Sequence, residues 1–133
     1  MPFEVDVEFI VAVERALGCA LPASYRAAMM RSNGGEVSAL DEAWWLYPIA
    51  DASTSPRISR TANHVLRETE QARAWPGFPI EALAIASNGD GDQLVLLRDG
   101  ADFGDAVFAW RHDTRETIQV VADFAELTSG ETR

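Results

Sequence analysis

Apolar residues near the start of the chain recur at intervals of three and four positions. Between Asp6 and Leu17 they fall on one side of a helical wheel, which predicts an amphipathic helix with one buried face. Gly18 can end this helix, because glycine readily adopts the left-handed conformation found at helix ends. Pro22 suits the first turn of a second helix, which we expect to end at Asn33-Gly34-Gly35.

The middle of the chain changes from one periodicity to another. Residues 43–49 are rich in aromatics and predict a strand, which Pro48 would end or place at the edge of a sheet. Helical spacing returns over residues 56–75 and predicts one continuous central helix, with Ser55 as its cap. Two prolines and a glycine then make the segment up to Pro79 irregular.

Three short apolar segments follow, at residues 83–86, 93–97 and 106–110, and each predicts a strand. Short polar connections between them favour antiparallel pairing. Residues 120–127 predict a closing helix, and residues 129–133 a frayed polar tail. The sequence therefore predicts an α+β fold: a single antiparallel sheet of about four to six strands with packed helices, two N-terminal, one central and one C-terminal.

The length of 133 residues fits one domain, which we expect over residues 1–133 with its core at about residues 6–128. The one cysteine, Cys19, cannot form an internal disulfide, which suits a reducing compartment. The N-terminus lacks the features of a secretory signal, and no window approaches the length of a membrane helix. We therefore expect a cytoplasmic protein.

The balance of charges points to the kind of partner. With 21 acidic and 11 basic residues, the net charge is -10. An acidic surface repels phosphate backbones, so we expect no direct binding to nucleic acid, and none to a membrane. The same surface would attract a basic protein and accelerate the encounter, although acidity can also serve solubility alone.

One motif resembles the start of a calcium loop. Asn88, Asp90 and Asp92 have the one-three-five spacing of an EF-hand. Such a loop needs glycine at position six and glutamate at position twelve, where this chain has Gln93 and Asp99. The flanking segments also predict strands instead of helices. We therefore interpret the motif as a tight acidic turn and expect no metal site.

The residues most suited to nucleophilic or acid–base chemistry are Cys19, His64 and His112. They are scattered along the chain, and no phosphate-binding glycine loop precedes a helix. Cys19 is expected to be a small packed side chain, and both histidines are expected at the surface. We therefore expect no enzymatic activity, no catalytic residues and no cofactor; the alternative is an enzyme whose site the sequence does not reveal.

Two of the four tryptophans are adjacent. Trp44 and Trp45 point to opposite faces if their segment is a strand. One would then fill the core, while the other would be covered by another element or would face solvent or a partner. On an exposed edge strand it could support self-association, so we expect a monomer or a weak homodimer.

Several short motifs occur in an order and spacing typical of one family. They are Leu21-Pro22-x-x-Tyr25-Arg26, Asn33-Gly34-Gly35, the strand with Trp45, Tyr47 and Ile49, Ile85-Ala86-x-Asn88-Gly89-x-Gly91-Asp92, Trp110-x-His112, and Val121-Ala122-x-Phe124-x-x-Leu127. Together they resemble the SUKH superfamily, the Smi/Knr-type domain, over roughly residues 9–127. The resemblance implies helices packed on one antiparallel sheet and no shared catalytic set.

Bacterial members of this superfamily are similar to immunity proteins of polymorphic and contact-dependent toxin systems. The resemblance therefore implies a protein that binds and neutralises a cognate toxin, often a nuclease. Fungal relatives regulate cell-wall synthesis and carry long extensions, which this chain lacks, and this favours the bacterial role. The alternative is a generic protein-interaction or regulatory domain without a toxin partner.

Candidate contacts with a partner are chosen from the acidic and aromatic residues expected at the surface. They are Asp41, Glu42, Trp44, Trp45, Asp90, Asp92, Asp102 and Asp105. The choice rests on expected exposure and not on a family motif. Their carboxylates would attract a basic toxin and could imitate phosphates in the active site of a nuclease.

Overall fold

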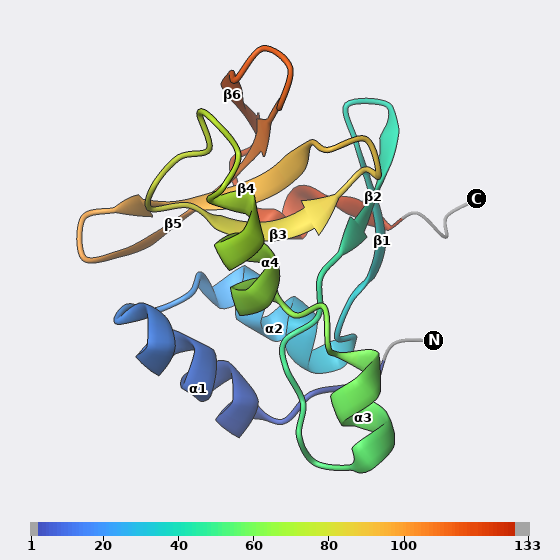
Figure 1. Ribbon diagram of the computed structural model, residues 1–133. Helices are drawn as coiled ribbons and strands as arrows, with labels where there is room; N and C mark the ends of the chain where they lie inside the picture. Colours follow the sequence, from blue (N-terminus) through green and yellow to red (C-terminus); the bar gives the residue numbers. More distant parts are fainter. Residues whose placement is uncertain (1–2, 130–133) are drawn as a thin grey trace.

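The two N-terminal helices form where the sequence predicts them. The computed structural model describes residues 3–129 and places α1 at Val7–Leu17 and α2 at Ala23–Arg31 (Figure 1). Gly18 ends α1 in the left-handed conformation, with a φ of 76°. Tyr25 of α2 is fully buried, and its ring meets the ring of Phe124 edge-on, with 5.1 Å between centroids. This contact fixes α2 against the C-terminal part of the chain.

The predicted central helix is divided in two. Helix α3 covers Ser55–Arg60 and α4 covers Val65–Ala72, so the prediction of one continuous helix over residues 56–75 was wrong. The cap of α3 is also one residue earlier than predicted, at Thr54. None of the helices within residues 3–129 has the length and apolar character needed to cross a membrane.

The division arises because side chains bind the backbone between the two helices. The hydroxyl of Thr61 donates to the carbonyl of Arg57 (2.8 Å) and accepts the N–H of Asp51 (3.0 Å). His64 then begins α4, and its Nδ1 accepts the N–H of Arg67 (3.3 Å). Polar side chains that hydrogen-bond to nearby backbone groups compete with helix continuation. Here these hydrogen bonds end α3 and start α4.

The described residues form a seven-stranded sheet, and each pair of neighbouring strands is antiparallel. In spatial order the strands are β6 (Thr117–Val121), β5 (Asp102–Trp110), β4 (Gln93–Asp99), β3 (Leu83–Ser87), β2 (Glu42–Leu46), β1 (Gly35–Ala39) and β7 (Thr128–Ser129). The predicted α+β class with a single antiparallel sheet is confirmed, and the short β7 takes the count above the expected four to six. Strand β2 lies between β3 and β1, so it is not the exposed edge on which the expected self-association was based.

The predicted closing helix at residues 120–127 was wrong. Its first residues belong to β6, where Val121 pairs with Val107. The side chain of Asp123 then accepts the N–H of Ala125 (2.8 Å) and caps a single turn, η1 (Phe124–Glu126). The β-branched valines favour a strand, and the aspartate starts a turn before a helix can extend.

The end of the chain is ordered further than the sequence predicts. Ser129 pairs with Val37, so β7 adds a short edge strand to β1. Ser129, the first residue of the predicted frayed tail at residues 129–133, is therefore paired, and residues 130–133 lie outside the described part of the chain.

The centre of the sheet is buried on both faces. Leu94, Val95 and Leu96 are consecutive and fully buried, although successive side chains of a strand point in opposite directions. Helix α4 lies against β3 (Figure 1), where the hydroxyl of Thr69 accepts the N–H of Ala84 (2.8 Å). Burial on both faces makes these strands a rigid support for the loops at their ends.

Asn33 joins the end of α2 to the segment that follows β2. Its buried side chain accepts the N–H of Ile49 (2.7 Å) and donates to the carbonyl of the same residue (2.9 Å). Its own N–H donates to the carbonyl of Phe3 (2.7 Å). One amide side chain therefore satisfies both polar backbone groups of Ile49, which would otherwise be buried without partners.

Replacing Asn33 by alanine is expected to lower the free energy of unfolding by about 2 kcal/mol, because two buried backbone groups lose their partners. Urea unfolding followed by circular dichroism measures this loss. The matched control is Asn63→Ala at an exposed position, which should change stability by less than about 0.5 kcal/mol. Equal stability of the two variants would contradict the role given to Asn33.

Candidate functional site

A cluster of charged and polar side chains lies at one end of the sheet, where three segments meet. Glu42 begins β2, the turn 88–92 joins β3 to β4, and Arg111 directly follows β5. In the turn, the side-chain oxygen of Asn88 accepts the N–H groups of Asp90 (2.9 Å) and Asp92 (3.3 Å). The motif is thus a tight acidic turn between two strands, as the sequence predicts.

Arg111 bridges the carboxylates of two separate segments. Its Nη1 lies 2.8 Å from Oδ2 of Asp92, and its Nη2 lies 2.7 Å from Oε2 of Glu42. The Nδ2 of Asn88 donates to both carboxylates, at 2.9 Å to Glu42 and 3.0 Å to Asp92. The guanidinium also lies 5.7 Å from the ring of the buried Trp44. We call Glu42, Asn88, Asp92 and Arg111 the ion-pair network.

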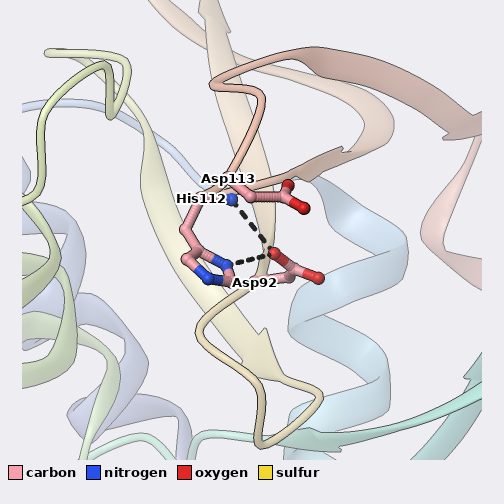
Figure 2. A group of neighbouring side chains, drawn as sticks. All are labelled: Asp92, His112 and Asp113. Atoms are coloured by element: carbon pink, nitrogen blue, oxygen red, sulfur yellow. Dashed lines mark hydrogen bonds and ion pairs between the residues drawn. The ribbon is translucent and has the colours of Figure 1, made fainter.

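His112 extends the network towards a neighbouring loop. Figure 2 shows both its backbone nitrogen and its Nδ1 directed at one oxygen of Asp92, at 3.0 Å and 2.7 Å. The imidazole meets the ring of Trp75 edge-on, with 5.8 Å between centroids. Gly91 permits this approach, because a Cβ there would lie 3.0 Å from Nδ1 of His112.

The residues of this site most suited to a metal are Asp92, His112 and Asp113. Their ligand atoms lie within 4.8 Å of one another. However, one oxygen of Asp92 already accepts from His112, and the other accepts from Arg111 and Asn88. A cation would have to displace these donors, so we interpret the group as structural.

The environment fixes the charges of the network. Burial favours the neutral form of Asp92, but hydrogen bonds from His112, Arg111 and Asn88 outweigh it and lower the pKa to about 2. The hydrogen bond from Arg111 likewise lowers the pKa of Glu42, against a smaller opposing effect of burial. Hydrogen bonds to Glu42 and Asp92 in turn raise the pKa of Arg111. All three groups are therefore charged at neutral pH.

The structure separates the predicted contact residues into two groups. Asp41, Glu42, Asp90 and Asp92 lie at the end of the sheet that holds the network. Asp102 and Asp105 lie towards the opposite end of β4 and β5, where Asp102 accepts the N–H of Ala20 (2.9 Å). The two groups do not form one acidic surface.

The degree of exposure also divides these residues. Asp41, Asp90, Asp102 and Asp105 are exposed, whereas Asp92 is buried and Glu42 is half-buried in the network. Trp44 is fully buried, and its indole N–H donates to the carbonyl of Ala39 (3.0 Å). Trp45 is 51% exposed and is the tryptophan of the pair that can meet a partner.

The sequence did not reveal Arg111 or Trp75 as parts of this site. A single arginine after a strand carries no motif, and Trp75 stands where the predicted central helix meets the segment predicted as irregular. The available signal was the dipeptide Arg111-His112 at the end of a strand, opposite an acidic turn. Hairpin pairing of β4 with β5 brings these two places together, since Gln93 pairs with Trp110.

These features define an α+β domain built on one antiparallel sheet, with an ion-pair network that fixes the loops at one end. A family model described as the SMI1 / KNR4 family (SUKH-1) matches residues 4–130, so the chain belongs to this family. The match confirms the resemblance seen in the sequence motifs. A search of curated proteins found no matching relative.

Asp92 is expected to make stability depend on pH in the acid range. Its folded-state pKa of about 2 lies below the unfolded value of 3.8, so its charge stabilises the fold above about pH 4. This contribution falls by about 1 kcal/mol by pH 3 and by about 2 kcal/mol by pH 2. Urea unfolding between pH 5 and pH 3 should therefore show a steeper loss in the wild type than in Asp92→Asn.

The matched control is Asp90→Asn, in the same turn but with an exposed carboxylate. Its stability should follow the wild-type curve across this pH range. Parallel curves for the wild type and Asp92→Asn would show that the network does not hold Asp92 in its charged form.

Proposed function

We propose that this protein is an immunity protein that neutralises a cognate toxin by direct, stoichiometric binding. The observation that carries the proposal is the family match over residues 4–130, because the SUKH family is known for toxin immunity. The toxin would belong to a polymorphic or contact-dependent system, and a nuclease is the class that suits the charge of this chain best.

The charge distribution supports a basic partner. A nuclease holds phosphate backbones with basic residues, and such a surface is attracted to a protein with a net charge of -10. Glu42 and Asp92 already bind Arg111, so they are poorly suited to imitate phosphates. Of the predicted contact residues at this end of the sheet, the exposed Asp41 and Asp90 are the carboxylates that can face a toxin.

Cys19, His64 and His112 are the residues most suited to catalysis, and each lies in surroundings that give it a structural role. Burial raises the pKa of the Cys19 thiol, which favours its less reactive neutral form. His64 caps α4, and His112 holds Asp92. Packing and hydrogen bonding therefore explain the presence of these three side chains without a catalytic role, which supports a binding function.

Co-expression tests the proposal. Cells that produce the toxin-domain protein encoded next to this gene should survive when they also produce this protein, because the toxin is held in an inactive complex. The purified pair should elute from size exclusion as one complex of fixed stoichiometry, and His64→Ala should protect as well as the wild type.

A neighbouring toxin domain that this protein neither binds nor neutralises would overturn the proposal. Binding without protection would favour a regulatory interaction domain instead. A loss of protection in folded His64→Ala would favour a catalytic function.

Ionic strength should affect the formation of the complex more than its dissociation. Raising salt from 50 mM to 500 mM is expected to lower the association rate constant at least about tenfold, because the attraction between the opposite net charges is screened. Surface plasmon resonance measures both rate constants. An association rate independent of salt would contradict electrostatic attraction to a basic toxin.

A further inference from the structure

Two half-exposed tryptophans lie on the same face of the sheet. Trp45 is 51% exposed and Trp75 is 50% exposed. Paired residues of adjacent strands point to the same face, and the pairs Trp45–Ser87, Ser87–Gln93 and Gln93–Trp110 connect β2 to β5. The loop that carries Trp75 lies on the Trp110 side, since the indole N–H of Trp110 donates to the carbonyl of Gly77 (3.1 Å).

The residues between the two tryptophans form a polar floor. The hydroxyl of Tyr47 donates to the side-chain oxygen of Gln93 (2.9 Å), and Ser87 accepts the N–H of Gly89 (3.0 Å). Three strand spacings, roughly 14 Å, separate β2 from β5. We call Trp45, Trp75, Ser87, Gln93 and His112 the tryptophan surface.

Both tryptophans of this surface are held in place by the rest of the fold. Trp45 belongs to an interior strand, and Trp75 packs against His112, which is bound by Asp92. The indoles are therefore exposed but anchored to a rigid support. Fixed, exposed tryptophans around polar groups are typical of binding hot spots.

The charges around Trp45 select a cationic partner. Glu36 is its cross-strand partner and is exposed, and Asp90 is exposed in the turn that follows Ser87. The carboxylate of Glu36 beside an open indole face suits an arginine or lysine, which can bind the ring and the acid together, and Asp90 adds to the negative charge at this end of the sheet. Beside Trp75, the turn 112–116 adds Asp113, Glu116 and one arginine.

Two other apolar residues that are more than half exposed lie close to arginines. Ile80, which is 83% exposed, lies beside a hollow whose charged lining residues are Arg73, Arg98 and Glu81. Ile58, which is 54% exposed, lies on α3 with Arg57 and Arg60. These arginines make both places less suited to a cationic partner than the tryptophan surface.

We infer that the tryptophan surface is the docking site for a basic segment of the toxin, with an arginine or lysine against Trp45. This inference rests on the proposed function and specifies where the partner binds. The probe is the catalytically inactivated toxin domain encoded beside this gene, and calorimetry measures its dissociation constant.

Trp45→Ala and Trp75→Ala should each weaken binding roughly 30-fold, the loss expected at a hot spot. The matched controls Ile58→Ala and Ile80→Ala should stay within about twofold of the wild type. Circular dichroism confirms that each variant is folded.

A second pair of variants tests the charge without removing a tryptophan. Glu36→Arg and Asp105→Arg change the net charge equally at exposed positions in strands, but only Glu36 adjoins Trp45. Glu36→Arg should weaken binding at least about tenfold more than Asp105→Arg, since it places a cation where the partner's cation binds.

Three outcomes would overturn the inference. In the first, the wild type binds the toxin, but the tryptophan variants bind it equally well or both arginine variants weaken binding alike. In either case the toxin binds elsewhere on the protein, and the proposed function stands. If the wild type forms a dimer in the absence of the toxin, and Trp45→Ala dissociates this dimer, the tryptophan surface serves self-association. If the wild type does not bind the toxin at all, both the inference and the proposed function fail.

Discussion

The contact of Arg111 with two carboxylates is the constraint on which this end of the molecule depends. Glu42 and Asp92 belong to segments far apart in the sequence, and without a cation between them their charges would repel. With Arg111 in place, β2, the acidic turn and the end of β5 have one fixed arrangement. His112 is positioned by the same carboxylate, and Trp75 packs on His112. A half-buried charged cluster therefore holds the exposed aromatic surface in place.

The sequence was most informative where local pattern and tertiary structure agree. Helix α1 with its glycine stop, the three central strands and the acidic turn were all predictable from spacing and turn residues. The central helix was not, because hydrogen bonds between the backbone and the side chains of Thr61 and His64 decide where it breaks. Strands β1 and β6 are five residues long and bury two residues and none, respectively, so an apolar pattern gave little signal for them.

The candidate site was predictable only in part, for a different reason. Acidic residues can be counted in a sequence, but whether each carboxylate is free depends on the fold. Asp90 and Asp92 are two positions apart, yet one is exposed and the other is buried against Arg111 and His112. Trp44 and Trp45 differ in the same way. Acidity therefore has two tasks here: some carboxylates stabilise the fold, and others are available to attract a basic partner.

The four indole N–H groups offer the most direct test of where the partner binds. Trp44 and Trp110 donate theirs to carbonyls inside the fold, whereas Trp45 and Trp75 are half-exposed. In a titration of ¹⁵N-tryptophan-labelled protein with the unlabelled, inactivated toxin domain, we predict that the indole resonances of Trp45 and Trp75 shift or broaden most. Saturable binding that leaves both of these resonances unchanged would contradict the account.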